Sequence, residues 1–175
     1  MGGVKGWSCW EELKDTYEIG IDEDVKHVGQ RSGYVTKKNG LGRYGAIMQK
    51  VSAEEYRGKR VRFSAYVKCR GVTERCGLFM EVFDRQIDIK ASLQASDSMY
   101  NRPISGTQDW QEHAIVLDVS FDSFGINIGA RLFGPGTMWI DGVSFEEVGK
   151  DVPSTDELNA RKYPARPQNL SFEDL

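Results

Sequence analysis

The feature that most constrains this chain is an alternation of apolar and polar residues with a period of two, which dominates from residue 44 onward. It is clearest in residues 60–70, where the apolar positions are Val61, Phe63, Ala65, Val67 and Cys69. Successive side chains of a β-strand point to opposite faces, so this run predicts a strand with one face in the core and the other facing solvent or a ligand. Turn residues recur at short intervals, which favours an antiparallel β-sandwich over alternating strands and helices.

A second strand is predicted for residues 76–84, and residues 71–75 are expected to join the two strands as a hairpin. The apolar face of this second strand consists of Leu78, Met80 and Val82. Its opposite face carries Phe79, Glu81 and Phe83, so large aromatic residues stand where polar residues are expected. Either both faces of the strand are covered, or the aromatic face binds something.

The remaining predicted strands bring the total to about nine, the size of a jelly-roll sandwich. They are residues 17–21, 34–36, 44–51, 87–93, 113–119, 125–133 and 137–148. Short helical turns are predicted for residues 8–14 and 52–56, because in both a serine precedes glutamates in the manner of a helix cap. After Gly149 the apolar content falls and prolines recur, so we expect one domain over residues 1–150 and a C-terminal tail over 151–175.

Composition excludes several classes of protein. A chain of 175 residues suits one domain, and a formal charge of −3 without a basic stripe argues against direct nucleic-acid binding. No apolar run approaches the roughly 20 residues that a membrane-spanning helix needs. The three cysteines lack Cys-x-x-Cys spacing, so we expect a reducing, cytoplasmic location with Cys69 and Cys76 as free thiols.

Catalytic signatures are missing from the sequence. His27 and His113 are the only imidazoles, and there is no nucleophile elbow, zinc-protease motif, phosphate loop or dinucleotide fingerprint. Adjacent carboxylates such as Glu146 and Glu147 would point to opposite faces of a strand rather than flank a scissile bond. We therefore expect a binding protein and not an enzyme.

Several segments resemble carbohydrate-binding-module-like jelly rolls of the galactose-binding-domain-like superfamily. They are residues 44–49, 56–64, 107–111 and 136–148. More narrowly, residues 100–107 followed by 116–119 resemble a bacterial subgroup of these modules, which occurs alone or attached to AraC-type transcriptional regulators and to some hydrolases. The resemblance covers about residues 15–150, and it implies an all-β jelly roll without implying a particular ligand.

The chain departs from that family at its first strand. Members usually begin with an Asn-x-x-Phe-Glu strand, which here occurs only at the far end, from Asn169 to Glu173. We expect residues 168–174 to fill the first-strand position, in the same molecule or in a neighbour; the alternative is a disordered tail or the start of another module. The resemblance also implies a structural calcium ion held by Asp141 and, if the tail docks, by Glu173; the alternative is that Asp141 caps a turn or faces water.

A ligand face is expected on the side of the strands opposite the core. Its candidate residues are Arg62, Ser64, Tyr66, Lys68, Phe79, Glu81, Phe83, Asn127, Arg131 and Phe133. Sugars need this mixture, because aromatic faces stack on C–H patches while arginine, asparagine and glutamate bind hydroxyls. The alternative is that the phenylalanines form a second covered face or a homodimer contact. Trp110 and Trp139 are interpreted as packing residues, and Tyr100, Asn101 and Arg102 as secondary ligand candidates.

These patterns favour a non-catalytic module that binds a carbohydrate-like or other small polar ligand on a concave face. The alternative is an interaction or sensory module that assists a transcriptional regulator through protein contacts. In that case the aromatic face forms a protein interface and binds no sugar.

Overall fold

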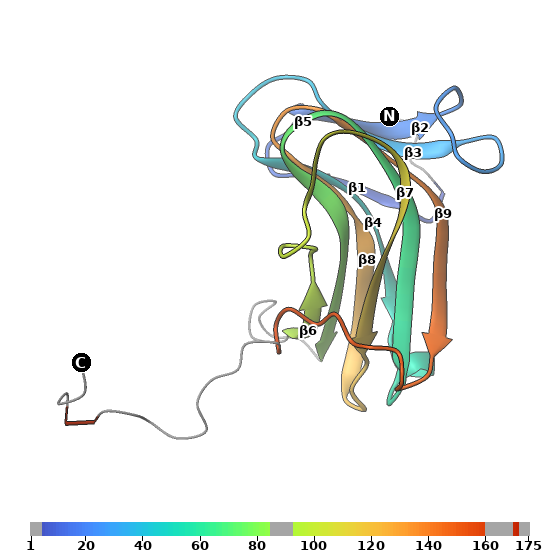
Figure 1. The fold of residues 1–175 in the computed structure, drawn as a ribbon, viewed down its shortest axis with the longest axis vertical. Helices are drawn as coiled ribbons and strands as arrows, with labels where there is room; N and C mark the ends of the chain where they lie inside the picture. Colours follow the sequence, from blue (N-terminus) through green and yellow to red (C-terminus); the bar gives the residue numbers. More distant parts are fainter. Residues whose placement is uncertain (1–4, 85–92, 160–169, 172–175) are drawn as a thin grey trace.

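The computed structural model describes residues 5–84, 93–159 and 170–171. The described chain is almost entirely β-structure, with one 3-10 turn, η1 (Glu54–Tyr56) (Figure 1). The strands are β1 (Ser8–Glu11), β2 (Tyr17–Asp22), β3 (Ser32–Lys37), β4 (Tyr44–Ser52), β5 (Arg60–Asp84), β6 (Leu93–Asp97), β7 (Ile104–Asp118), β8 (Ser123–Phe133) and β9 (Thr137–Val148). Among the described residues, no helix is long and apolar enough to span a bilayer.

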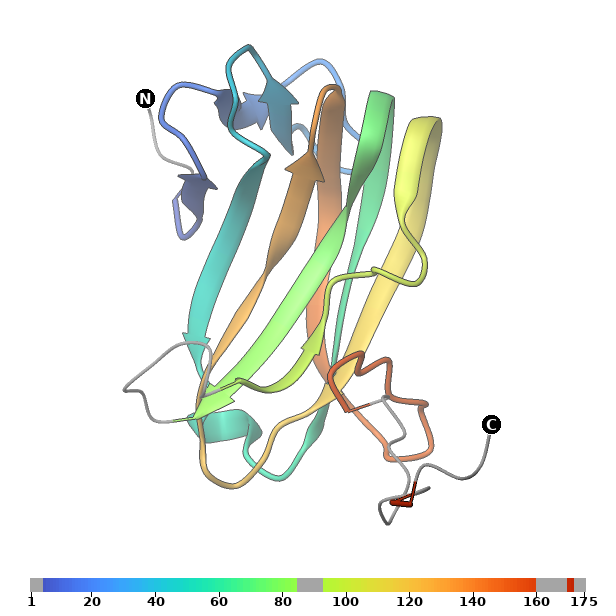
Figure 2. The same ribbon diagram turned by 90° about the vertical axis from the view of Figure 1, so that its left-hand side faces the viewer.

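The strands form two layers that share β5, and all strand pairs are antiparallel. We call one layer the β9 sheet, in the order β7, first half of β5, β9, β3, β2. The other is the β8 sheet, in the order β6, second half of β5, β8, β4, β1. Figure 2 looks onto the β8 sheet, with the β9 sheet behind it. The expected antiparallel β-sandwich is confirmed.

The predicted hairpin at residues 71–75 is wrong, because β5 continues through this segment as one strand of 25 residues. β7 runs alongside both halves of β5, from the pair Arg60 and Asp118 to the pair Cys76 and Ile104. Register shifts between residues 67 and 76 mark irregularities that let the strand bend while keeping its partner. Gly71 has a φ of 61°, which turns the chain from one layer to the other instead of back on itself.

The core lies between the two layers and is built from the residues that alternation predicted. In the first half of β5, the residues Val61, Phe63, Ala65, Val67 and Cys69 are all buried. In the second half, Leu78, Met80 and Val82 face the same core from the other sheet. Cys69 and Cys76 are buried free thiols, and burial raises the pKa of Cys76 above its ordinary value.

The helix predicted over residues 8–14 is also wrong, because residues 8–11 form β1 at the edge of the β8 sheet. β1 pairs with β4, from Ser8 opposite Met48 to Glu11 opposite Gly45. The Glu11 carboxylate, part of the apparent helix cap, instead accepts backbone N–H groups of the next turn, including that of Tyr17 at 2.9 Å. The short turn predicted at residues 52–56 is confirmed as η1.

Residues 150–159 form a strap along the open side of the sandwich. Thr155 donates its N–H to the carbonyl of Val116 on β7, and Glu157 donates its N–H to the carbonyl of Ser96 on β6. β7 ends one sheet and β6 ends the other, so the strap occupies backbone groups on a free edge of both. In the tail beyond it, only Leu170 and Ser171 are described, in a turn, so docking of residues 168–174 stays a prediction.

Candidate ligand-binding face

Six of the predicted ligand residues lie together on the outer side of the β8 sheet. They are Phe79, Glu81, Phe83, Asn127, Arg131 and Phe133. Their register explains the grouping, because Glu81 stands opposite Asn127, and Gly129 stands opposite Phe79. The absence of a side chain at Gly125 leaves room for a ring, since a Cβ there would lie 2.5 Å from the ring of Phe83.

The backbone of the sheet is concave on this outer side (Figure 1). In Figure 1 the strands β8 and β5 bow toward the core, and their upper ends lean outward over the face. The register shifts of β5 between residues 67 and 76 lie where this strand turns into the β8 sheet. That a ligand uses this concave side stays a prediction.

A polar triad occupies the middle of the face. Arg131 Nη2 lies 3.0 Å from Glu81 Oε1, and Asn127 Nδ2 donates to Glu81 Oε2 at 3.1 Å. The side chains of Arg131 and Glu81 are each 24% exposed. Arg131 Nε and Asn127 Oδ1 are buried and have no hydrogen-bond partner among the described residues. An unmet buried polar atom costs about 1–3 kcal/mol, so the triad can gain from further partners.

A row of aromatic rings crosses one end of the face, from β1 through β4 to β8. The Trp10 and Tyr44 ring centroids are 4.8 Å apart, and those of Tyr44 and Phe133 are 5.3 Å apart. The guanidinium of Arg75 continues the row, 3.9 Å from the centroid of Phe133 and 4.6 Å from that of Tyr100. Trp10 is 46% exposed and Tyr100 is 72% exposed, so both rings are open to a ligand.

Two of the predicted rings are covered. Phe79 is 1% exposed and lies under Arg131, whose guanidinium carbon is 3.8 Å from the ring centroid. Phe83 is 6% exposed, and Lys50 Nζ lies 4.6 Å from its centroid. For these two residues the structure agrees with the alternative of a covered face. Their cation–π contacts hold charged groups on the surface above them.

Arg62 and Tyr66 lie on the outer side of the β9 sheet. The expectation that all candidate ligand residues share one face is therefore wrong for these two. Arg62 pairs with Glu112 at 3.0 Å and Glu146 at 3.2 Å. Tyr66 stacks on His27 with centroids 4.0 Å apart. Ser64 and Lys68 share this side of the first half of β5. The separation arises because β5 changes layers, so its two halves present outer faces on opposite sides of the molecule.

Asp141 serves as a cap for a loop. Its Oδ2 accepts the N–H groups of His27 and Val28 at 2.7 and 2.9 Å, and its Oδ1 accepts that of Gly142 at 2.7 Å. N–H groups directed at both oxygens do not suit a calcium cage, and the described residues hold no cluster of three or more His, Cys, Asp or Glu that fits a metal. Glu173 lies outside the described residues, so a calcium site that includes it stays a prediction.

The loop that carries Tyr100 is fixed from below by a buried ion pair. Arg102 donates to both carboxylate oxygens of Asp97, at 2.5 and 3.1 Å, and also to the carbonyl of Ala114 at 3.1 Å. Asp97 is fully buried and also accepts the N–H of Met99 at 2.7 Å. Arg102, a secondary ligand candidate, is therefore a positioning residue for the loop.

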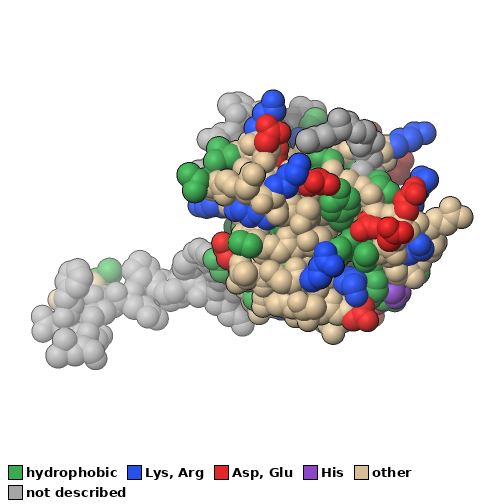
Figure 3. Space-filling view, turned by 90° about the horizontal axis from the view of Figure 1, so that it is seen from above, with side chains coloured by type: hydrophobic (Ala, Val, Ile, Leu, Met, Phe, Trp, Pro, Cys, Tyr) green, Lys and Arg blue, Asp and Glu red, His purple; other side chains and the backbone are tan. Residues whose placement is uncertain are grey.

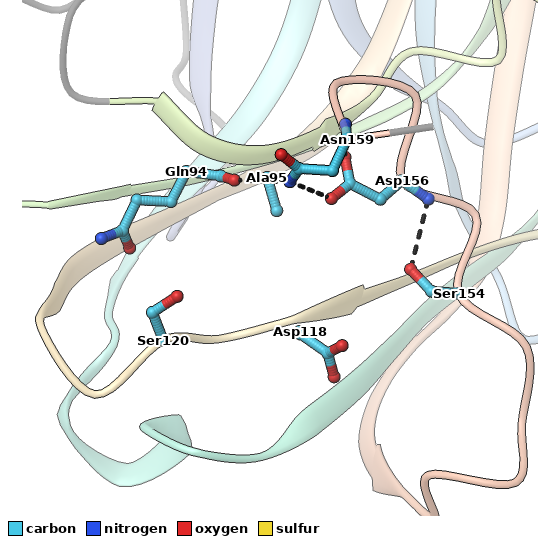
Figure 4. Close-up of a pocket in the computed structure, with 7 residues that line it drawn as sticks. All are labelled: Gln94, Ala95, Asp118, Ser120, Ser154, Asp156 and Asn159. Carbon is cyan, nitrogen blue, oxygen red and sulfur yellow. Dashed lines mark hydrogen bonds between the residues drawn. The ribbon is translucent and has the colours of Figure 1, made fainter. Parts of the chain in front are cut away.

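The strap contacts the same loop through Glu157. Its carboxylate accepts the N–H of Ser98 at 3.0 Å and that of Asn101 at 3.1 Å. Beside the strap lies a polar pocket of about 400 Å³ (Figure 4), lined by Gln94, Ala95, Asp118, Ser120, Ser154, Asp156 and Asn159. The Asp156 carboxylate accepts the side-chain N–H of Asn159 at 2.6 Å, so these two polar groups of the lining are already paired with each other.

Trp139 is 4% exposed, which confirms its interpretation as a packing residue, and its indole donates to Asp22 at 2.8 Å. Trp110 is half-buried beside His27, away from the β8 sheet. The end view in Figure 3 shows Lys and Arg side chains interspersed with Asp and Glu over the end of the sandwich where β5 crosses between the layers.

Sequence reasoning did not place Trp10, Tyr44 and Arg75 on this face. The predicted strand over residues 44–51 includes Tyr44, but the partner strand that brings Tyr44 to Phe133 is distant in sequence. Trp10 lies in the segment predicted as a helical turn, and Arg75 in the segment predicted as a hairpin loop. For both residues the local signal gives the wrong element and so does not place the residue on the face.

Comparison with known proteins gives one close sequence relative and many structural ones. No protein-family model matches the chain. This chain is 41% identical over 173 residues to the uncharacterized HTH-type transcriptional regulator YbfP of Bacillus subtilis. The match covers 98% of this chain and 57% of the regulator, so the chain spans little more than half the length of this relative.

Three solved structures illustrate the fold. A xylan-binding CBM22-1 domain of Paenibacillus barcinonensis Xyn10C aligns with a TM-score of 0.56 and 18% identity, covering 85% of this chain and 89% of that domain. TmCBM61, solved with β-1,4-galactotriose, gives 0.52 and 13%, covering 84% and 92%. The enzymatically active domain of tailspike protein 4 of bacteriophage CBA120 gives 0.64 and 13%, covering 83% of this chain and 20% of that one. The chain therefore has the β-sandwich fold of carbohydrate-binding modules.

Proposed function

We propose that this chain is a non-catalytic module that binds a carbohydrate-like ligand on the outer side of the β8 sheet. The observation that carries this proposal is the pairing of an aromatic row, from Trp10 to Phe133, with the polar triad of Glu81, Asn127 and Arg131 on one face of the β8 sheet. Rings bind the C–H patches of a sugar, and the triad offers both donors and acceptors to its hydroxyls. Strands hold these groups in fixed positions, which suits recognition of a small rigid ligand.

The structural neighbours support this proposal, because several are binding modules and one was solved with a galactose trisaccharide. Their identity to this chain is low, so the support concerns the scaffold and not the ligand. We infer that catalysis is not its role, since its groups suit binding and most of these neighbours are binding modules.

A second candidate is a sensory or interaction module of a transcriptional regulator. The 41% identity to a protein named as such a regulator favours it. The two candidates are compatible if a sugar is the signal. They differ if the aromatic row contacts a protein, in which case the row is buried in a complex and no sugar binds to it.

The test is an isothermal calorimetry and saturation-transfer NMR screen of soluble mono- and oligosaccharides. Tyr44→Ala removes a ring from the row, and Tyr66→Ala is the matched control because its ring lies on the outer side of the β9 sheet. We expect Tyr44→Ala to weaken binding by about 10-fold, corresponding to about 1.4 kcal/mol of lost stacking, and Tyr66→Ala to leave it unchanged. Lack of any sugar binding, or equal losses in both variants, would contradict the proposal.

A further inference from the structure

We propose that the ligand of this face carries an acidic group, a carboxylate or a phosphate on a sugar, and that Arg75 pairs with it. This inference rests on the proposed function and specifies its ligand class. It follows from the charges on the face, from the position of Arg75, and from the exposed ring beside it.

The described residues of the face carry more positive than negative charge. The cations are Lys50, Arg75 and Arg131, and the carboxylate is that of Glu81. Glu81 is already occupied on both oxygens, by Arg131 on one and by Asn127 on the other. No ion pair among the described residues joins a carboxylate to Arg75 or Lys50, and Glu157 and Glu74 act on the charge of Arg75 only from beyond ion-pair distance.

Arg75 is held in place without an ion-pair partner among the described residues. Its guanidinium lies between the rings of Phe133 and Tyr100, and its one described hydrogen bond is a long contact of 3.5 Å from Nη1 to the carbonyl of Ser98. Burial lowers the pKa of Arg75, and the nearby charge of Arg131 lowers it further, although Tyr100, Glu157 and Glu74 act in the opposite direction. A partly desolvated cation of this kind gains strongly from an anion.

The geometry suits a carboxylate or phosphate. A guanidinium is planar and has five N–H donors, so with its plane fixed by two rings it can offer two parallel donors to an oxyanion. Lysine would not provide this fixed fork. The two rings thus position Arg75 for bidentate recognition.

The surroundings favour an acidic sugar over a free anion. Tyr100 is 72% exposed beside the guanidinium, and the row through Phe133, Tyr44 and Trp10 continues away from it. A ligand whose acidic group meets Arg75 therefore has an aromatic surface available for its ring. An inorganic anion could pair with Arg75, but it has no ring to stack on this aromatic surface.

The experiment compares matched ligands on the full chain by isothermal calorimetry. The neutral probes are glucose and galactose, the carboxylate probes are glucuronate and galacturonate, and the phosphate probes are glucose 6-phosphate and galactose 6-phosphate. The methyl ester of glucuronate keeps the shape of the acid without its charge, and inorganic phosphate and acetate test the anion alone. The variants are Arg75→Gln and Arg75→Lys, with Lys68→Gln as a charge-matched control on the opposite side of the molecule. Thermal unfolding confirms that each variant is folded.

We expect at least one acidic sugar to bind about 10-fold more tightly than its neutral counterpart and than the ester, a difference of about 1.4 kcal/mol. Arg75→Gln should abolish this preference, so that an acidic sugar, its ester and the neutral sugar bind this variant with equal affinity. Arg75→Lys should restore the preference only in part, and Lys68→Gln should keep it. Whether uronates or sugar phosphates gain more identifies the source of the acid.

Equal binding of acidic and neutral sugars would overturn this inference and leave the proposed function standing. So would a preference for acids that survives in Arg75→Gln, or inorganic phosphate binding as tightly as a sugar phosphate. Failure of every sugar to bind would overturn the proposed function, and this inference with it.

Discussion

The ion pair between Asp97 and Arg102 allows a sharp test of how the Tyr100 loop is held. We expect Arg102→Gln to destabilise the protein, because it leaves the Asp97 carboxylate, which is fully buried, with the N–H of Met99 as its remaining described donor. Breaking one side of a buried pair costs about 3–5 kcal/mol. The Arg102 side chain is 34% exposed, so water can partly replace it, and we take the low end, about 3 kcal/mol.

For a domain of this size, a loss of about 3 kcal/mol corresponds to a fall in Tm of about 6–12 °C. The measurement is thermal unfolding by circular dichroism, with urea titration to obtain the free energy and to check that the m-value is unchanged. Arg62→Gln is the control, because Arg62 also bridges two strands but pairs with glutamates that are 46% and 52% exposed. It should cost less than about 1 kcal/mol. If both substitutions shift Tm equally, the reasoning from burial is refuted.

Two further predictions concern the stability of the β-sandwich and the dependence of that stability on pH. Gly129→Ala should lower stability by about 1–3 kcal/mol in urea titration, since its Cβ would lie 2.3 Å from the carbonyl oxygen of Ile47. Gly71→Ala has open space and should cost only about 1 kcal/mol of backbone strain; a ranking in the reverse order would contradict this reasoning. The Arg60 side chain is the largest influence lowering the pKa of Asp118 to about 2, so the stabilisation is complete above the unfolded pKa near 4 and is lost as pH falls toward 2. Asp118→Asn should therefore cost about 1 kcal/mol at pH 7, after allowing for a side chain that is 47% exposed, and almost nothing near pH 2; an equal cost at both pH values would contradict the assignment.

The sequence predicted those parts of the fold that depend on local alternation. The strand over residues 137–148 has the bounds that the sequence indicated, and Val61 to Cys69 face the core as expected. The hairpin was wrong because Gly71 is a turn residue by local criteria, whereas the pairing of Cys69 and Val72, on either side of it, with the distant β7 keeps β5 one strand.

The candidate face was predicted in part for the same reason. Alternation tells which side of a strand avoids the core, but it does not tell which sheet the strand belongs to. The prediction was right for Phe133 and Glu81 because both lie in the β8 sheet and share its outer face. It was wrong for Tyr66, which lies in the β9 sheet. Arg75 was missed because its importance comes from two rings that are distant in sequence, Phe133 and Tyr100.

The strand β5 belongs to both sheets, and this has a consequence for the ligand face. Sliding or opening one layer against the other would stretch a continuous backbone or break its pairing with β7, which follows it across the bend. The curvature of the β8 sheet is thus set by a covalent connection as well as by packing. A ligand would meet a surface that is already shaped, so little conformational entropy would be lost when it binds.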